Sequence, residues 1–250
     1  MKITIITATF NSATHIKEVS ESIEKQTYTN LEWIVIDGSS TDGTIDLLKN
    51  NKTISALVSE PDKGIYDALN KGIDLATGDV IGFLHSDDLF NSPETLKYIS
   101  EAFGSEGVSI VYGDLIFVDQ HNTNEAHRYW KSEPFYPSLL KRGWMPPHPT
   151  VFMRKEVYEK HGLFNINLKC SADYDHLLRV FSDPSLKTVY IPVTITKMRI
   201  GGRSTKGLWN LITKKREDYL VLRHNCIPRP FITLLMKNLL KIPQLLNKQD

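Results

Sequence analysis

Two adjacent carboxylates, Asp87 and Asp88, closely follow a short apolar run at Val80–Leu84. At the end of a buried strand they would repel each other and lose hydration, and a divalent cation relieves both costs. Mg²⁺ and Mn²⁺ prefer such oxygen ligands and usually share them with substrate phosphates. The pair therefore predicts a Mn²⁺ or Mg²⁺ site that neutralises a departing diphosphate. Asp-Asp pairs also close turns or cap helices without any ligand.

A third carboxylate, Asp37, follows the apolar run Trp33–Ile36. A buried carboxylate only accepts hydrogen bonds, and uracil presents an N3–H donor where cytosine presents an acceptor. Asp37 in a base pocket would therefore prefer uracil or thymine, because the wrong base leaves a buried group unpaired. Phe10, in an earlier strand-end loop, could stack on the base. The alternatives are a side-chain-closed turn for Asp37 and core packing for Phe10.

The segment Glu60–Gly72 places several charged side chains around a loop and the first turns of a helix, among them Asp62, Lys63 and Lys71. Helix N-termini favour anionic ligands, so the two lysines could face a ribose or a phosphate. The same pattern is typical of a capped amphipathic helix with solvated charges.

Asp173 and Asp175 stand just before an apolar helical stretch. A carboxylate is a competent general base for a sugar hydroxyl when the substrate is held close. The alternative for either residue is a helix N-cap.

The first half of the chain alternates β-branched runs with helical patterns, which predicts an α/β fold with a mostly parallel sheet and helices on both faces. In such sheets ligands bind at the carboxyl ends of the strands, where the polar clusters fall. Helices are predicted to begin near Ser12, Asp42, Gly64 and Pro93. Strands are predicted at Ile3–Ala8, Trp33–Ile36, Ile54–Val58, Val80–Leu84 and Val108–Tyr112.

The second half is less regular. It predicts extended or hairpin segments over 114–134, a loop around His148, helices at 154–161 and 173–182, strands at 187–191 and 194–199, and helices over 208–223 and 230–247 with a kink at Pro243. We divide the chain into a catalytic domain over 1–205, with a donor-binding half (1–115) and an acceptor-binding half (116–205), and a basic amphipathic helical tail over 206–250.

Charge is unevenly distributed along the chain. Residues 203–250 hold ten Lys/Arg and three Asp/Glu, whereas residues 1–202 hold 20 and 26. The acidic body argues against nucleic-acid binding. The basic tail, with apolar residues from Phe231 to Leu246 at helical spacing, favours peripheral contact with an anionic membrane surface through 229–247. Packing of this tail on the catalytic domain or on a second subunit is the alternative.

Composition is ordinary for a globular protein, with 41% hydrophobic and 24% charged residues. Cys170 and Cys226 form no metal-binding or redox motif. No secretory signal and no apolar run near 18 residues is present in the sequence. We therefore expect a cytoplasmic protein, whose tail could bind peripherally to the inner face of the plasma membrane.

Four motifs at the predicted strand ends together resemble the family 2 glycosyltransferases, which bind nucleotide-sugars on a GT-A fold. They cover residues 1–115, and the likeness returns at 146–182 and 201–204. The Asp62–Gly72 segment and His148-Pro149-Thr150 are similar to the bacterial subgroup that builds surface polysaccharides, of the colanic-acid type, and lipid-linked glycans. The motifs are Thr7–Asn11, Asp37–Thr44, Asp62–Gly72 and Ser86–Asp88.

The resemblance implies a role for each matching residue. Asp37 would meet the uracil N3–H, Asp62 would lie near the base and ribose, Asp87 near the ribose, and Asp88 would be the principal metal ligand. Asp173 matches the second acid of the family's Glu-Asp pair, which is the catalytic base in inverting members. The other donor-site candidates are Thr7, Ala8, Thr9, Phe10, Asn11, Ser39, Lys63 and Lys71, and the acceptor-side or loop candidates are His148, Asp175, Gly202 and Arg203.

Two positions depart from the family pattern. Ala172 stands where the Glu of the Glu-Asp pair would be, and His85 stands where many members have the first Asp of the metal motif. The first departure affects acceptor orientation and the second affects metal affinity.

The resemblance implies an inverting, metal-dependent transferase that moves a hexosyl or N-acetylhexosaminyl group. The donor would be a UDP-sugar, and the acceptor a glycan or lipid-linked saccharide in cell-surface polysaccharide biosynthesis. A nucleotidyltransferase would need a glycine-rich phosphate loop, and residues 7–15 contain no glycine. A non-catalytic nucleotide-sugar-binding protein and a nucleotide-sugar hydrolase remain as alternatives, although Asp88 and Asp173 argue against the first.

Overall fold

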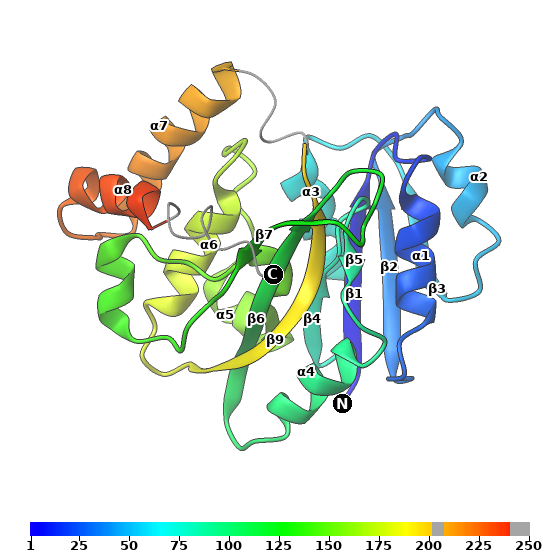
Figure 1. Ribbon diagram of the computed structural model, residues 1–250, viewed down its shortest axis with the longest axis horizontal. Coiled ribbons are helices and arrows are strands. Elements are labelled where there is room, and N and C mark those ends of the chain that lie inside the picture. The colour runs from blue at the N-terminus through cyan, green and yellow to red at the C-terminus, as the bar shows by residue number, and fades with distance from the viewer. Residues whose placement is uncertain (202–207, 241–250) are drawn as a thin grey trace.

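The computed structural model describes residues 1–201 and 208–240, and within these residues nine strands form one sheet. The first four strands run parallel to one another, as the alternation of strands and helices predicts. Figure 1 shows them in the right half of the molecule, with the chain's N-terminus at their lower ends. They are β1 (Ile3–Thr9), β2 (Leu31–Asp37), β3 (Ile54–Ser59) and β4 (Val80–Phe83).

The second half of the chain extends the same sheet beyond β4. The order is β3-β2-β1-β4-β8-β6-β9-β5, with β8 antiparallel to both neighbours and β9 parallel to β6. β7 pairs with β6 as the predicted hairpin. The expected α/β fold with a mostly parallel sheet is therefore confirmed. These strands are β5 (Leu89–Phe90), β6 (Val108–Val118), β7 (Ala126–Trp130), β8 (Phe152–Arg154) and β9 (Lys187–Arg199).

β9 corrects one prediction, since the two expected strands at 187–191 and 194–199 form a single strand. Pro192 lies in its middle and has no N–H to donate to the ladder. The pairing with β6 accordingly shifts register there, from Tyr112 opposite Tyr190 to Asp114 opposite Thr194. The strand bends past the proline instead of ending.

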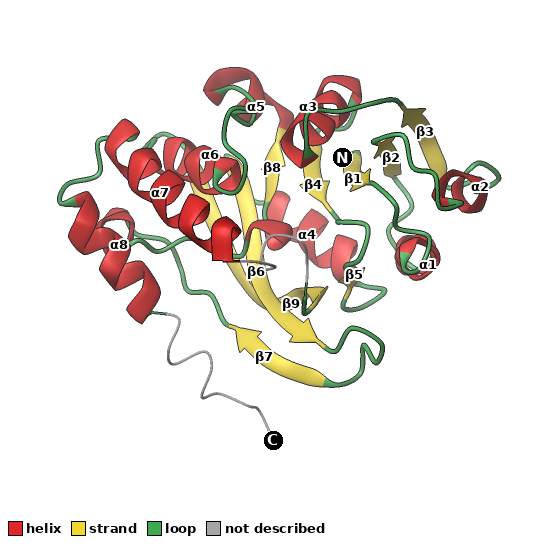
Figure 2. Ribbon diagram, turned by 90° about the horizontal axis from the view of Figure 1, so that it is seen from above, coloured by secondary structure: helices red, strands yellow, loops and turns green. Residues whose placement is uncertain are grey.

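Helices cover both faces of the sheet, as Figure 2 shows with α3 and α5 above the strands and α1 and α4 below. Alternate residues of β1 serve the two faces: Ile6 joins the core under α3, α5 and α6, whereas Ile5 joins the core under α1, α2 and α4. The helices are α1 (Ile16–Glu24), α2 (Thr44–Leu48), α3 (Ile65–Leu75), α4 (Thr95–Phe103), α5 (Lys155–His161) and α6 (Ala172–Phe181).

Close packing sets the position of α3. A Cβ at Gly72 would lie 2.4 Å from Ile6 Cγ2, so only glycine lets the helix approach β1 this closely. The N-terminus of α3 is thereby held at the carboxyl edge of the sheet.

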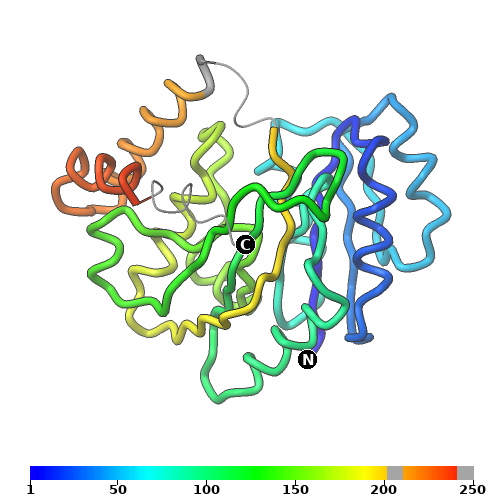
Figure 3. The backbone as a smooth tube through the Cα atoms, in the orientation of Figure 1, coloured from blue at the N-terminus to red at the C-terminus, as the bar shows by residue number. Residues whose placement is uncertain are grey.

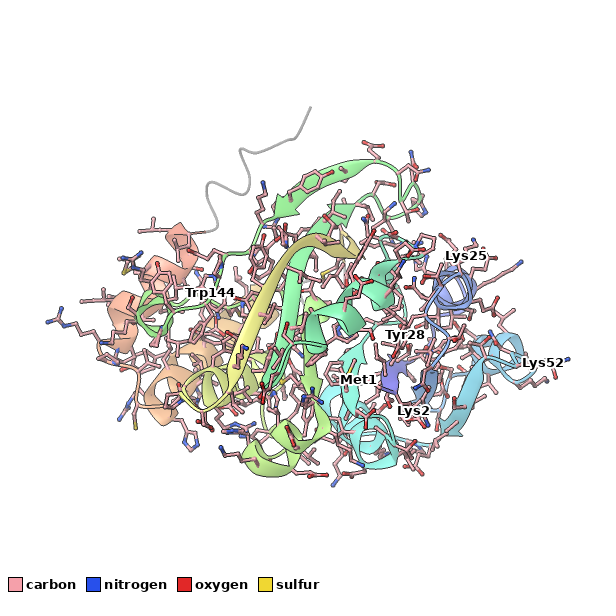
Figure 4. The ribbon with its side chains drawn as sticks, turned by 90° about the horizontal axis from the view of Figure 1, so that it is seen from below. Met1, Lys2, Lys25, Tyr28, Lys52 and Trp144 are labelled. Carbon is pink, nitrogen blue, oxygen red and sulfur yellow. The ribbon has the colours of Figure 1, made fainter. Side chains whose placement is uncertain are left out.

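The opposite, amino edge of the sheet is closed by polar contacts. Lys2 Nζ lies 2.6 Å from Glu32 Oε1, and the Tyr28 hydroxyl donates to the Met1 carbonyl. Burial alone would raise the pKa of Glu32, but hydrogen bonds from Lys2, Thr4 and Thr77 lower it to about 2. Met1, Lys2 and Tyr28 lie together in Figure 4, well away from Trp144. The polar loops that follow the strands lie at the opposite, carboxyl edge.

Two further helices, α7 (Leu208–His224) and α8 (Pro230–Leu239), follow the sheet and lie beside α6 and the 3-10 turn η1 (Pro137–Arg142) (Figure 3). The predicted tail helices are present, but the stretch beyond residue 240, including Pro243, lies outside the described residues. None of the helices in the described part of the chain combines the length and apolar character that crossing a bilayer requires.

Candidate active site

The carboxyl ends of β1, β2 and β4 bring three polar loops to one edge of the sheet, at the top in Figure 1. Thr9 and Asp37, the last residues of β1 and β2, are partners in the parallel register. The hydroxyls of Ser12 and Ser86 lie 2.9 Å apart and tie the loop after β1 to the loop after β4. Motifs that are distant in sequence therefore share one surface.

One corner of this edge gathers Phe10, Gly38 and Asp62. A Cβ at Gly38 would lie 2.5 Å from Asp62 Oδ2 and 3.4 Å from Phe10 Cδ2, so the glycine makes room for both side chains. Phe10 is 41% exposed, so the core-packing alternative for it is wrong. Asp62 Oδ1 accepts the Gly64 N–H at 2.8 Å, which orients the carboxylate. The structure brings an exposed aromatic ring and a carboxylate together beside Asp37.

Asp37 itself is fully buried and closes a turn. Its carboxylate accepts the Ser40 N–H at 2.9 Å, the Ser40 hydroxyl, and the Ser59 hydroxyl at 2.7 Å. Ser39, at φ 65°, reverses the chain so that Ser40 can reach back. The turn alternative thus holds for Asp37, and about one of its four acceptor positions stays open.

Three candidates from the first strand lie inside the protein. Thr7 is fully buried and its hydroxyl accepts the Trp33 indole N–H at 3.0 Å, and Ala8 is part of the core. Their assignment as pocket-lining side chains is corrected, because β1 is covered on both faces. Thr9 is 3% exposed, and its hydroxyl has no hydrogen-bond partner within the described residues.

Asn11 holds one loop to another: its Oδ1 accepts the Thr41 N–H at 2.9 Å, and its own N–H donates to Ser40 Oγ at 2.7 Å. Its backbone adopts φ 51°, a left-handed conformation that asparagine tolerates. Asn11 therefore ties the loop after β1 to the loop after β2.

The two lysines of the 60–72 segment behave differently. Lys71 Nζ lies 2.7 Å from Glu60 Oε1 and 3.2 Å from the Pro61 carbonyl, and its bond to Glu60 raises its pKa. A phosphate that binds Lys71 would have to displace Glu60. Lys63 has an exposed side chain, while its N–H donates to Asp67 Oδ2 at 3.0 Å.

Asp88 has the environment that a metal ligand requires. It is 1% exposed, and Oδ2 has no hydrogen-bond partner within the described residues. Burial, and then the neighbouring Asp87, raise its pKa well above the ordinary range. Over the described residues no set of three or more His, Cys, Asp or Glu side chains could hold an ion, so a cation at Asp88 needs ligands from a substrate or water.

Arg199, which sequence reasoning missed, braces the Asp87-Asp88 turn from behind. Its side chain is 3% exposed, and it donates to the carbonyls of Asp87 and, at 3.1 Å, Gln120. It also lies 2.7 Å from Glu18 Oε2. Its charge acts on Asp88 in the direction that lowers the pKa. The only sequence signal was an arginine at the end of a predicted strand.

Asp173 is the second residue of α6 and faces the N-terminus of α3. The Tyr66 hydroxyl donates to Asp173 Oδ1 at 3.2 Å. Burial, and then the charge of Asp173, raise the pKa of Tyr66, so this phenol keeps its proton and orients the carboxylate. Tyr66 lies in the 60–72 segment, but its residue type carried no distinguishing signal.

Two histidines lie beside Asp173. Burial lowers the pKa of His85, and the charges of Asp87 and Asp173 offset only part of this effect. The His148 ring centroid lies 6.3 Å from that of His85, and the ring stacks on Phe83 at 5.4 Å. Burial lowers the pKa of His148 to about 4, so it is neutral near pH 7. The Nδ1 atom of His85 has no hydrogen-bond partner within the described residues.

The remaining acceptor-side candidates are Asp175, Gly202 and Arg203. Asp175 is buried, and it accepts from Arg179 at 3.2 Å and from Asn225 at 2.9 Å, so its role is corrected to joining α6 to the end of α7. Neither Asp173 nor Asp175 is the N-cap of α6, which is Ser171. Gly202 and Arg203 lie outside the described residues.

The Arg199 contacts lead to a stability prediction. Arg199→Lys keeps the charge but cannot reach all of its partners, so it leaves buried carbonyls unpaired and should lower the free energy of unfolding by about 1–3 kcal/mol. Glu18→Gln is the matched control, because the Glu18 side chain is 52% exposed and its ion pair should contribute under about 1 kcal/mol. Urea unfolding of both variants measures the two effects. Equal losses would contradict the buried-carbonyl explanation.

Comparisons with known proteins identify the family. The family model described as Glycosyl transferase family 2 matches residues 4–162. A PGL/p-HBAD biosynthesis glycosyltransferase of Mycobacterium bovis is 33% identical over 216 residues, which cover 84% of this chain and 80% of that protein.

Solved structures share the architecture at low sequence identity. S. aureus TarS in complex with UDP-GlcNAc superposes with a TM-score of 0.71 at 18% identity, covering 91% of this chain and 66% of that one. The Pyrobaculum calidifontis mannosyltransferase PcManGT, in complex with GDP-Man and Mn²⁺, gives 0.68 at 20% identity, covering 97% and 70%. This chain thus spans about two thirds of the TarS chain. The match to the family model and to the mycobacterial relative shows that the chain belongs to glycosyltransferase family 2, with a GT-A fold.

Proposed function

We propose that this family 2 glycosyltransferase is an inverting, metal-dependent enzyme that transfers a sugar from a UDP-sugar to a hydroxyl of a saccharide or lipid-linked acceptor in cell-surface polysaccharide biosynthesis. The observation that carries the proposal is the buried Asp88 carboxylate, whose Oδ2 has no partner among the described residues. Leaving a buried carboxylate oxygen without a partner is costly unless a ligand completes it.

Asp88 Oδ2 would hold Mn²⁺ or Mg²⁺, and diphosphate oxygens and water would complete the coordination. The ion supplies charge neutralisation for the departing nucleoside diphosphate. The unpartnered oxygen and the raised pKa of Asp88 fit this role, since a bound cation relieves both costs. Arg199 holds the turn that carries Asp88 in place.

Asp173 is the proposed general base. It would take the proton from the acceptor hydroxyl, whose oxygen then attacks the anomeric carbon from the face opposite the diphosphate, and the configuration inverts. The hydrogen bond from Tyr66 keeps the carboxylate in one orientation while it waits for the acceptor.

Asp37, Phe10 and Asp62 are proposed to receive the nucleoside. Phe10 is 41% exposed, and its aromatic ring is of the kind that stacks on a base. Asp37 has about one acceptor position left, which suits a single N–H donor such as uracil N3–H. The two similar structures hold different nucleotides, UDP-GlcNAc in TarS and GDP-Man in PcManGT, so the shared fold by itself does not fix the base.

Nucleotide binding tests the donor site. UDP should bind more tightly than GDP or CDP with Mn²⁺, and EDTA should weaken the binding. Asp88→Asn should weaken UDP binding with Mn²⁺ by about 10–100-fold, because it removes a charged ligand. Isothermal titration calorimetry measures these affinities, with the exposed Asp74→Asn as control. Metal-independent binding would contradict the role of Asp88, and a preference for GDP would contradict that of Asp37.

Transfer kinetics test the base. Asp173→Asn should lower the transfer rate by about 10²–10⁴-fold with UDP binding unchanged, because only the proton acceptor is lost. Release of UDP in the presence of a panel of saccharide and lipid-linked acceptors measures the rate. Asp175→Asn serves as the comparison and should lower stability more than turnover, since Asp175 bonds to Arg179 and Asn225. The assignment is wrong if Asp175→Asn abolishes transfer while Asp173→Asn retains it.

We further propose that α8 rests on the inner face of the plasma membrane. The polar residues Thr233 and Lys237 of this helix are buried against the protein. Its apolar residues Phe231, Leu235 and Leu239 are instead 73%, 55% and 53% exposed. Exposed basic residues occur on α7 and at the N-cap of α8, while the described acidic residues of α7 and α8 are buried. Apolar residues flanked by basic ones suit an anionic lipid surface. The basic residues are Lys215, Arg216, Arg223 and Arg229.

Sedimentation with lipid vesicles tests this contact. The full chain should bind phosphatidylglycerol vesicles and bind phosphatidylcholine vesicles much less, and high salt should weaken the binding. The double variant Phe231→Ser/Leu235→Ser removes exposed apolar surface only and should reduce binding without changing UDP affinity. Unchanged sedimentation of this variant would mean that α8 does not insert into the lipid.

A further inference from the structure

Two side chains of α7 hold the start of α6, which carries Asp173. The N-cap side chain of α6 itself makes no capping hydrogen bond. Ser171 is the N-cap, but its hydroxyl makes no bond to its own helix and instead donates to Asp218 Oδ1 at 2.8 Å. The backbone N–H groups of Lys169, Cys170 and Ser171 all donate to Glu217, at 2.9, 2.8 and 3.1 Å. Glu217 and Asp218 therefore grip the three residues that lead into the helix.

Both of these carboxylates are buried, at 8% and 5% exposure. Glu217 is compensated by the three backbone donors. Asp218 is compensated by Lys237 of α8, whose Nζ lies 2.9 Å from Oδ2 and 3.3 Å from the centre of the Tyr174 ring. Two adjacent buried carboxylates are costly, and apolar residues of similar size would often be as stable. Stability alone is therefore a weak reason for them to be here.

Close approach fixes α8 so that Lys237 can reach this position. A Cβ at Gly143 would lie 2.7 Å from Lys237 Cβ and 2.7 Å from the Thr233 carbonyl oxygen. The Thr233 hydroxyl also donates to the Lys141 carbonyl at 3.0 Å. A continuous chain of contacts thus runs from η1 through α8 and α7 to the first turn of α6.

We propose that Glu217 and Asp218 are positioning residues for Asp173, so that the helices α7 and α8 form part of the catalytic apparatus. The proposal rests on the function proposed above for Asp173. Tyr66 orients the carboxylate through a single hydrogen bond, whereas Glu217 fixes the backbone from which the side chain projects. A displacement of about 1 Å at a reacting group can cost on the order of 10²-fold in rate.

Glu217→Gln tests the proposal with little change of shape. One amide position becomes an NH₂ that faces backbone N–H donors, so at least one bond to residues 169–171 is lost. We expect kcat to fall by about 10–100-fold while the UDP dissociation constant stays within about twofold. Amide hydrogen exchange should rise at residues 169–175 and stay unchanged in β1 and β2.

A double-variant cycle separates positioning from a general loss of stability. If Glu217 acts through Asp173, Asp173→Asn/Glu217→Gln should be no slower than Asp173→Asn alone. Additive losses, or an unchanged kcat for Glu217→Gln, would overturn the proposal. Asp183→Asn is the matched control at the other end of α6, because Asp183 accepts the Ser185 N–H at 2.8 Å and the Lys160 ammonium at 2.7 Å. It should leave kcat unchanged.

A second variant and a hydrogen-exchange measurement cover the cases in which Glu217→Gln does not fold or Asp173 is not the base. If Glu217→Gln does not fold, Ser171→Ala removes only the hydroxyl that bonds to Asp218 and should give a smaller loss of kcat with unchanged UDP binding. If Asp173→Asn retains full transfer, the proposed base has failed. Hydrogen exchange still decides whether Glu217 holds the start of α6, and unchanged exchange at 169–175 would overturn that claim as well.

Discussion

A carboxylate that leaves water must find donors or a counter-ion, and this requirement organises the functional edge of the molecule. Both oxygens of Asp37 accept hydrogen bonds from Ser40 or Ser59, and Glu217 accepts three from backbone N–H groups. Asp88 is as buried as these, yet one of its oxygens has no partner among the described residues. The contrast marks Asp88 as the point at which a ligand completes the structure.

The loops around these carboxylates are mutually dependent. Ser12 meets Ser86, Asn11 meets Thr41, and Gly38 leaves the space that Asp62 occupies. A shift of one loop would therefore move its neighbours, because short hydrogen bonds and close contacts tolerate little displacement. Such coupling pre-organises a site before any ligand arrives, which lowers the cost of binding.

The second half of the chain completes what the parallel strands begin. β9 carries Arg199 to the back of the Asp87-Asp88 turn, and α6 carries Asp173 to the Tyr66 hydroxyl. α7 then holds the start of α6 through Glu217 and Asp218, and α8 neutralises Asp218 through Lys237. Compensated charges are thus found both at the sheet edge and in the C-terminal helices, whose exposed residues are mostly apolar or basic.

The sequence by itself determined the alternation of strands and helices over β1 to β4 and the polar motifs at the strand ends, whereas the short strands β5 and β8 were missed. Both depend on local periodicity and on the rule that parallel strands expose their carboxyl ends at one edge. It also singled out the family and the carboxylates Asp37, Asp88 and Asp173 as candidates. Only the tertiary structure decided which side chains are already engaged, because partners such as Glu60 for Lys71 depend on how the loop folds back.

Arg199, Tyr66 and Glu217 were beyond prediction for a related reason. Their partners lie 112, 107 and 46–48 residues away, and no spacing rule connects positions that meet only when a sheet and three helices are packed. Thr7 shows the reverse case, since its motif suggested a ligand while burial of β1 on both faces gave its hydroxyl to Trp33. Local pattern determined the type of most elements, and three-dimensional packing decided which atoms remain for chemistry.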